Sequence, residues 1–258
     1  MAMERERNRG LSVGVYDSGM GAKPIAALLK KRFPGMNVIE EKDYKNQPYG
    51  NKSEQFIIDA GFACFSKLME KGVNAIVVAC HTSSAIALPW LRKHFSLPVI
   101  GMLGPTARLL ANRYTDDEII WLATPASVQA NRLEPLARHL GFSGQFHAVA
   151  CDRWVDCIEK GNTLEIKYLV QEFIAGHQHL LSRQPCKLLY GCTHYPLIDQ
   201  AMKQLLGRND TCIDPAHAVV DDLELTLMQN DLLCQRSRPE VSFLKGVFSP
   251  LQTVLDTP

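Results

Sequence analysis

The sequence lacks the segments that would carry a chain out of the cytoplasm or hold it in a membrane. No apolar run is long enough to cross a bilayer, and the N-terminal stretch MAMERERNRG alternates charges where a signal peptide would have an apolar core. We interpret that stretch as a solvated arm. The eight cysteines contain no Cys-x-x-Cys pair. These absences predict a cytoplasmic protein whose thiols are reduced.

An excess of charge of one sign is also missing. The chain has 28 Lys and Arg against 27 Asp and Glu, which gives a formal net charge of +1. No broad electrostatic field is therefore expected to attract nucleic acid or a membrane surface, and the expected partner is a small molecule. Low-complexity segments and linkers are absent too. With 258 residues and 46% hydrophobic content, the chain is long enough for two closely packed domains.

Apolar, strand-like runs alternate with segments of helical pattern along the chain. The expected strands cover residues 11–17, 37–41, 74–80, 98–101, 118–124, 145–151 and 186–192. The expected helices lie within residues 18–33, 53–72, 81–95, 105–114, 127–141 and 165–183, and residues 43–53 form a long loop. Alternation of this kind predicts an α/β fold with parallel sheets, whose ligands bind beyond the carboxyl ends of the strands.

Two of the expected strands end in the same unusual way. NAIVVACHTSSA and CKLLYGCTHYPL each deliver a cysteine, Cys80 or Cys192, at the strand end, followed by Thr and His in opposite order. An inert core cysteine favours apolar neighbours, whereas a cysteine that becomes a thiolate needs hydrogen-bond donors and access to substrate. Asp17 and Ser18 end a third strand in the same setting. We therefore select Cys80 and Cys192 as functional and interpret the other six cysteines as structural.

Four motifs carry a family resemblance. GVYDSGMG, PYGNKS, VVACHTSSA and YGCTHYP resemble, in order and spacing, the signature stretches of the glutamate racemases, which belong to the aspartate/glutamate racemase superfamily. The resemblance implies two pseudo-symmetric α/β domains with mostly parallel sheets flanked by helices, and an active site in the cleft between them. The expected first domain takes residues 1–104 and 213–258, and the second takes residues 105–212.

The resemblance implies an isomerase that interconverts L- and D-glutamate and supplies D-glutamate for peptidoglycan precursors. Inverting an amino acid at Cα requires removal of a proton from one face and its replacement on the other, which two opposed bases can do. A thiol, with a pKa of about 8.5, can serve as acid or base after a modest shift. The family pattern makes Cys80 and Cys192 this pair, so that neither pyridoxal phosphate nor a metal is required.

The same resemblance assigns the supporting residues. It places Asp17 near Cys80, and it places His194 and the acidic Glu159 near Cys192, as further catalytic groups. Ser18, Thr82 and Thr193 also lie at strand-to-helix turns, where hydroxyls and unpaired backbone N–H groups can converge on a carboxylate. The full set expected to bind the substrate is Asp17, Ser18, Pro48, Tyr49, Gly50, His81, Thr82, Thr193 and His194.

The chain departs from the family pattern at four positions. His81 stands where the family usually has asparagine, Ala22 replaces a glycine, Gly104 stands where glutamate is common, and Ala126 stands where threonine is common. A neutral imidazole can donate one hydrogen bond but cannot reproduce both functions of an amide. These departures bear on rate and on substrate choice.

Several alternatives stay open at this stage. The chain could be a racemase for aspartate or another amino acid, or a non-catalytic paralogue that binds a ligand or a protein; retention of both cysteines argues against the latter. A zinc site at Cys80, His81, Cys192 and His194 lacks the usual ligand spacing. The glycines after Asp17 lack the pattern of a phosphate loop. A homodimer also stays open, because the sequence does not determine the oligomeric arrangement.

Overall fold

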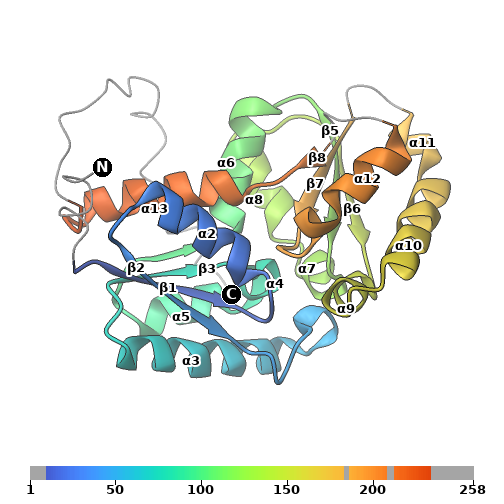
Figure 1. The fold of residues 1–258 in the computed structure, drawn as a ribbon. Helices are drawn as coiled ribbons and strands as arrows, with labels where there is room; N and C mark the ends of the chain where they lie inside the picture. The colour runs from blue at the N-terminus through green and yellow to red at the C-terminus, as the bar shows by residue number, and fades with distance from the viewer. Residues whose placement is uncertain (1–9, 183–185, 208–211, 234–258) are drawn as a thin grey trace.

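The computed structural model describes residues 10–182, 186–207 and 212–233. Within these residues, eight strands form two parallel sheets of four strands each (Figure 1). The expectations for the N-terminal arm, for Cys234 and for the last part of the first domain, residues 234–258, lie outside the described residues.

The two sheets have the same strand order. The first runs β2-β1-β3-β4 and the second β6-β5-β7-β8, with every neighbouring pair parallel. The strands are β1 (Ser12–Asp17), β2 (Asn37–Lys42), β3 (Ala75–Val78), β4 (Val99–Gly101), β5 (Glu118–Ala123), β6 (Phe146–Ala150), β7 (Cys186–Gly191) and β8 (Cys212–Ile213). This repetition confirms the predicted α/β fold of two pseudo-symmetric halves, in which β3 corresponds to β7.

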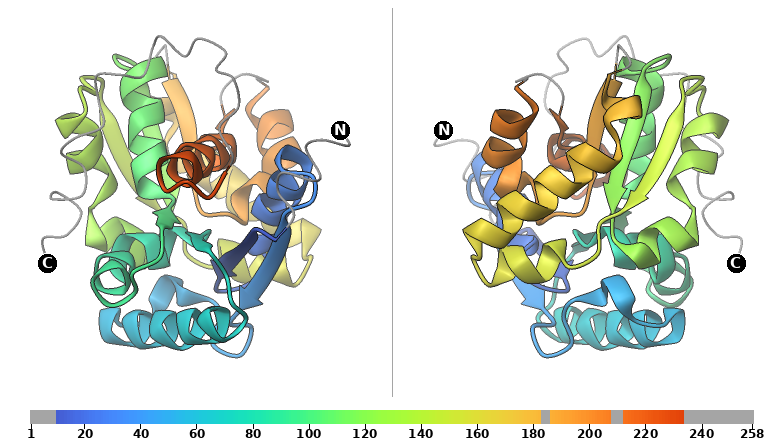
Figure 2. Two further views of the ribbon diagram at one scale, coloured as in Figure 1. Left: turned by 90° about the vertical axis from the view of Figure 1, so that its left-hand side faces the viewer. Right: turned by 90° about the vertical axis from the view of Figure 1, so that its right-hand side faces the viewer.

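Helices cover both faces of the first sheet, as Figure 2 shows from two sides. The helices α2 (Ala22–Arg32) and α13 (Ala216–Gln229) pack on one face, against alternate residues of β1 and β3. The helix α3 (Glu54–Glu70) covers the opposite face. Because α13 follows the last strand of the second sheet, the chain returns to the first half. This return supports, as a proposal, the division into residues 1–104 plus 213–258 and residues 105–212.

The second sheet is also covered by helices. The first half further contains α4 (His81–Ile86) and α5 (Leu88–His94), which pack on α3. The remaining helices are α6 (Leu103–Arg113), α7 (Pro125–Ala130), α8 (Leu133–His139), α9 (Trp154–Glu159), α10 (Thr163–Gly176), α11 (Gln178–Leu181) and α12 (Asp199–Leu206). One apolar cluster contains Phe65 of α3 and Trp121 of β5, both almost fully buried. The two halves therefore share a continuous core, which holds the strand ends of both sheets in fixed positions.

Three expected helices are each divided into two, and the predictions of single helices there were wrong. The helix expected within 81–95 breaks at Ala87, just before Pro89, which has no N–H to donate. The one expected within 127–141 ends at Asn131, whose φ of 43° is left-handed, and the one within 165–183 breaks at His177.

Several elements were not expected from the sequence. These are α9, α13 and the short strand β8. The loop expected over 43–53 contains a 3-10 turn at Tyr49–Asn51, and the Gln47–Pro48 peptide bond before it is cis. The turn presents Pro48, Tyr49 and Gly50 to the strand ends of both sheets.

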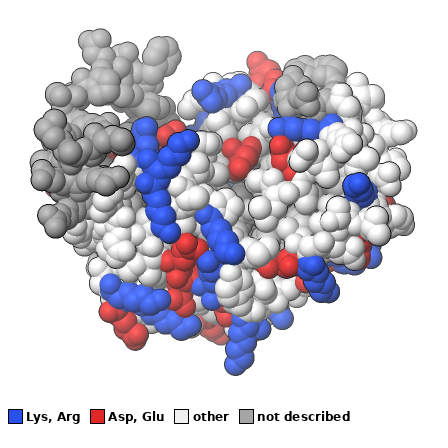
Figure 3. All heavy atoms as spheres, viewed as in Figure 1, with Lys and Arg blue, Asp and Glu red and all other residues white. Residues whose placement is uncertain are grey.

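Basic and acidic side chains are interspersed over the face shown in Figure 3, in keeping with the small net charge. Among the helices of the described ranges, none combines the length and the apolar character needed to span a bilayer.

Candidate active site

A small cavity lies where the carboxyl ends of the central strands of both sheets meet. Its lining consists of Ser18, Pro48, Tyr49, Gly50, Cys80, His81, Thr82, Thr124, Val155, Cys192, Thr193 and His194. Ten of these twelve residues were selected from the sequence. The space open to the centre of a water molecule is only about 10 Å³, room for about one water. The structure is therefore a closed form of the site.

Cys80 follows β3 and caps the N-terminus of α4. The backbone N–H of Ser83 donates to its sulfur at 3.4 Å, and the thiol lies 3.7 Å from the Ser18 hydroxyl. Burial raises the pKa of the Cys80 thiol, and the charge of Asp17 raises it further. The hydrogen bonds from Ser83 and Ser18 act in the opposite direction, because they stabilise the thiolate.

Cys192 has a different set of neighbours. Its sulfur lies 3.6 Å from Nδ1 of His194, and Nε2 of the same ring lies 2.6 Å from Oε1 of Glu159. The N–H of Met20 donates to that carboxylate oxygen at 2.9 Å. With Nε2–H donated to a carboxylate, Nδ1 is left as an acceptor for the thiol proton. Burial raises the pKa of Cys192 well above its usual range.

Asp17 connects the two sides of the site without lining the cavity. It is fully buried, and its carboxylate accepts from the N–H of Gly19 at 2.7 Å and from the hydroxyl of Thr193 at 3.1 Å. Burial raises the pKa of Asp17. Glu159 also stands behind the cavity wall and reaches it through His194. The glycine at 21 allows this packing, because a Cβ there would lie 1.9 Å from the Thr193 hydroxyl.

A cluster of hydroxyls on the second half was not expected. Thr124 follows β5, and its hydroxyl lies 2.9 Å from the hydroxyls of both Thr82 and Ser127. Extending the strand register one residue beyond the Ala123 to Gly191 pair sets Thr124 beside Cys192. The signal available in the sequence was its place at a strand end.

His81 is the departure from the family pattern with the largest structural consequence. The residue is 3% exposed, and neither ring nitrogen has a hydrogen-bond partner. Burial lowers the pKa of the imidazole to about 3, so the ring is neutral near neutral pH. Ala22 lies in regular helix, whereas Gly104 has only the end of the flexible Arg108 side chain near its Cβ position. Both of these departures fit the backbone.

Within the described residues, no group of three or more His, Cys, Asp and Glu side chains is arranged to hold a metal ion. The arrangement suits proton transfer instead. Two thiols that follow corresponding strands line the same cavity, one beside hydroxyls and the other beside an imidazole and carboxylate pair.

Comparison with known proteins identifies the family. The family model for Asp/Glu/hydantoin racemases matches residues 44–223. The glutamate racemase of Gloeobacter violaceus is 32% identical over 217 residues, which cover 83% of this chain and 80% of that protein.

Solved structures give the same result. A glutamate racemase isoform from Bacillus anthracis superposes with a TM-score of 0.79 at 28% identity, over 88% of this chain and 85% of that one. The Francisella tularensis glutamate racemase, solved with D-glutamate, gives 0.78 at 27% identity, over 91% and 86%. The family-model match, the identity to a glutamate racemase and the superposition on solved glutamate racemases lead to one conclusion: this chain belongs to the Asp/Glu/hydantoin racemase family and groups with its glutamate racemases.

Proposed function

We propose that this protein interconverts L- and D-glutamate without pyridoxal phosphate, using Cys80 and Cys192 as its two acid/base groups. The observation that carries the proposal is the placement of both thiols, on corresponding strands of the two halves, in the wall of one closed cavity. An amino acid held between them would expose one face of Cα to each sulfur. One thiolate removes the proton while the other thiol supplies one, and the roles exchange in the reverse direction.

Each thiol needs help to lose its proton, because burial opposes the charged form. At Cys192, Nδ1 of His194 can take the proton, and the Glu159 carboxylate stabilises the imidazolium that forms. At Cys80, no such base is in contact. The N–H and hydroxyl of Ser83 and the hydroxyl of Ser18 stabilise the thiolate instead.

The substrate itself supplies positive charge. Among the described residues that line the cavity, none is lysine or arginine. Hydroxyls of Ser18 and Thr82, with the unpaired nitrogens of His81, are available to the carboxylates and the ammonium group. The Thr193 hydroxyl gives its hydrogen to Asp17, and its oxygen is left to accept from the ammonium group. The α-ammonium group is then the cation that can approach Cys80, and its entry favours the thiolate there. Substrate binding and activation of this thiol are coupled in this way.

The substrate enters through opening of the site. A cavity with room for about one water cannot admit glutamate. The wall formed by the Tyr49–Asn51 turn and Pro48 comes from a loop and touches the second half, where the Asn51 amide donates to Asp152 at 3.0 Å. This contact crosses between the halves and closes over the cavity, so that water is excluded during proton transfer.

The cellular role follows from the product. D-glutamate made by this reaction serves peptidoglycan precursor synthesis, and the location is the cytoplasm. The free thiols of the described cysteines support that location. A homodimer is a separate hypothesis, which sedimentation of the purified chain would test.

The decisive experiment incubates the purified protein with single L-amino acids in deuterated water, without added cofactor. Loss of the α-proton signal of glutamate, with appearance of the D form, is expected. Exchange with aspartate in place of glutamate would redirect the proposal to a different substrate. Undiminished turnover in the Cys80→Ala, Cys192→Ala double variant, or full loss of activity on treatment with a carbonyl reagent against pyridoxal phosphate, would refute the mechanism.

A further inference from the structure

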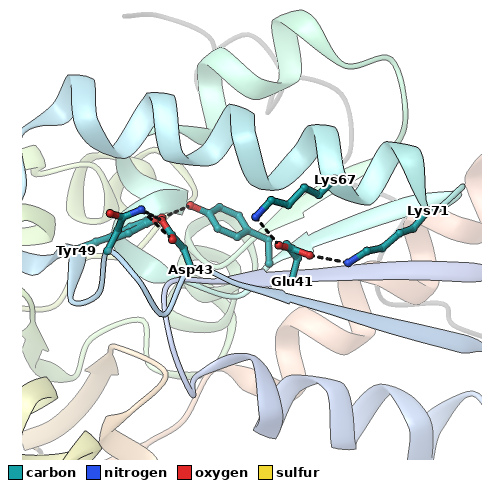
Figure 4. A network of polar contacts seen from close by, with 7 residues as sticks. Glu41, Asp43, Tyr49, Lys67 and Lys71 are labelled. Carbon is teal, nitrogen blue, oxygen red and sulfur yellow. Dashed lines mark hydrogen bonds and ion pairs between the residues drawn. The ribbon is translucent and has the colours of Figure 1, made fainter.

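A chain of buried hydroxyls leads from the surface of the first half to Cys80. Tyr16, the residue before Asp17 on β1, is fully buried, and its hydroxyl lies 3.2 Å from the Ser83 hydroxyl and 3.3 Å from the Tyr49 hydroxyl. Tyr49 in turn donates to Asp43 at 2.6 Å. Figure 4 shows this last contact at the edge of the sheet.

The far end of the chain lies beside a second group of charges. Figure 4 shows Glu41 between Lys67 and Lys71, which contact its two oxygens at 3.1 and 2.6 Å. Asp43 itself is held by the Asn46 amide, which donates to its oxygens at 2.9 and 2.8 Å. Asp43, the acceptor at the end of the hydroxyl chain, is therefore held by both Asn46 and Tyr49.

The hydrogen bonds along this chain of hydroxyls can point in either of two directions. Each hydroxyl carries one hydrogen. Tyr49 gives its hydrogen to the carboxyl group of Asp43 in a short contact. The Tyr16 hydrogen can then point either to Tyr49 or to Ser83. Ser83 lies directly against Cys80, since its backbone N–H is 3.4 Å from the sulfur, so its hydroxyl hydrogen can point either to Tyr16 or to that sulfur. The hydroxyls can rotate between these states without moving any heavy atom.

We propose that Tyr16 and Ser83 are positioning residues, whose hydroxyls turn toward Cys80 when its sulfur is charged and away from it when the sulfur is protonated. In the charged state Ser83 donates to the thiolate and Tyr16 donates to Ser83. In the protonated state both hydrogens point back toward Tyr49. Each hydroxyl keeps its own proton, so the arrangement stabilises the Cys80 thiolate without competing for the substrate proton. The link to catalysis rests on the function proposed above for Cys80.

The charged and titratable groups around Cys80 do not stabilise its thiolate, so hydroxyl hydrogen bonds are needed there. Asp17 on β1 and Cys192 beyond β7 oppose a second negative charge in the cavity, and Cys64 on α3 does so more weakly. The neighbouring His81 is neutral. No group in contact with Cys80 therefore offers a positive charge in the described residues, and oriented hydroxyl dipoles are the available means of stabilising the thiolate.

The test compares Tyr16→Phe and Ser83→Ala with the wild type by alkylation with iodoacetamide over a range of pH. The rate at each cysteine is read by mass spectrometry of its peptide, and Cys192 serves as the reference within the same cavity. Below its pKa, Cys80 of Ser83→Ala should react about 10-fold more slowly, as expected for loss of a hydrogen bond to a charged group. Tyr16→Phe should show a smaller decrease, and Cys192 should keep its rate in both.

Tyr190→Phe is the matched control. Tyr190 is also almost fully buried and also donates to a carboxylate, that of Asp199 at 3.0 Å, on the side of the second sheet away from the chain. The Tyr190→Phe variant should leave the rate of alkylation at Cys80 unchanged. Equal slowing of Cys80 and Cys192 would mean altered opening of the cavity and would overturn the proposal, as would unchanged rates in both variants.

Two further precautions keep the result decisive. If Ser83→Ala does not fold, Tyr16→Phe alone still tests the chain, because it removes one oxygen and keeps the ring. Alkylation does not depend on turnover. Selective slowing of Cys80 in a protein that fails to racemise glutamate would support the hydroxyl chain and contradict the proposed function.

Discussion

The two thiols occupy corresponding positions in the two halves, yet their surroundings are chemically different. Cys80 contacts neutral groups, namely the N–H of Ser83, which donates to the sulfur, and the hydroxyl of Ser18, which accepts from the thiol. Cys192 contacts an imidazole whose other nitrogen is held by a carboxylate. The same strand order therefore places both sulfurs equivalently, while the groups that can stabilise a charge on each sulfur differ. The two proton transfers need not be equally fast, and each can be disturbed separately.

Replacing either thiol should have the largest effect. Cys80→Ser or Cys192→Ser should reduce racemisation by about 10²- to 10⁴-fold, since serine is a much poorer base of nearly the same shape. A glutamate analogue with a leaving group at Cβ, which eliminates after abstraction alone, would separate the two faces. Each variant should process one enantiomer and fail on the other. The control is Cys212→Ser, on β8 outside the cavity.

Elimination of both enantiomers at equal rates by either single variant would contradict the two-base assignment. A thermal melt within a few degrees of the wild type excludes a folding defect, because a buried unsatisfied hydroxyl can itself cost about 1–3 kcal/mol.

Glu159→Gln should have the next largest effect, and only on the Cys192 side. A neutral amide stabilises an imidazolium less than a carboxylate does, by about 1.5–3 kcal/mol, so the rate for one enantiomer of the probe should fall about 10- to 100-fold. The matched control is Glu118→Gln, because Glu118 contacts Nε2 of His147 at 2.8 Å on the second sheet. Equal losses for both enantiomers would show that the pair does not belong to one thiol.

His81→Leu should weaken substrate binding while stabilising the empty protein. The two unpaired nitrogens cost stability, about 1–3 kcal/mol for each unsatisfied group, and leucine removes both at similar size. We expect KM to rise by about 10-fold and Tm to rise by several degrees, at about 2–4 °C for each kcal/mol. A lower Tm together with an unchanged KM would mean that the ring packs as a structural residue and does not face the substrate.

The smallest expected effect is a decrease in the free energy of unfolding at acid pH, which is negligible near neutral pH. The pKa of His81 is about 3 in the folded protein against an ordinary value of 6.5, so between these values the unfolded chain binds a proton that the folded chain does not. Above pH 6.5 the imidazole is neutral in both the folded and the unfolded chain, so its titration does not reduce the free energy of unfolding. Below it, the free energy of unfolding should fall by up to about 1.4 kcal/mol per pH unit. Urea titrations from pH 7 to pH 4.5 should show this slope in the wild type and a shallower one in His81→Leu.

The sequence motifs predicted which residues form the site better than they predicted the contacts between those residues. The equivalence of Cys80 and Cys192 could be inferred because parallel strands end at one edge of a sheet. The role of Thr124 was missed, because a threonine at a strand end is common and only its contact with Thr82 distinguishes it. The helix breaks at Ala87 and Asn131 were missed for a different reason, since apolar spacing continues across them.

The sequence by itself determined the alternation of strands and helices, the delivery of two cysteines to strand ends and the family to which the chain belongs, because these depend on short-range pattern and ordered motifs. Contacts between distant segments depended on the packed fold. Met20 donates to Glu159, Asp17 accepts from Thr193, and Tyr16 reaches Ser83. Each of these contacts joins residues far apart in the chain, and burial then sets their charge states, since the cost of a buried charge depends on everything packed around it.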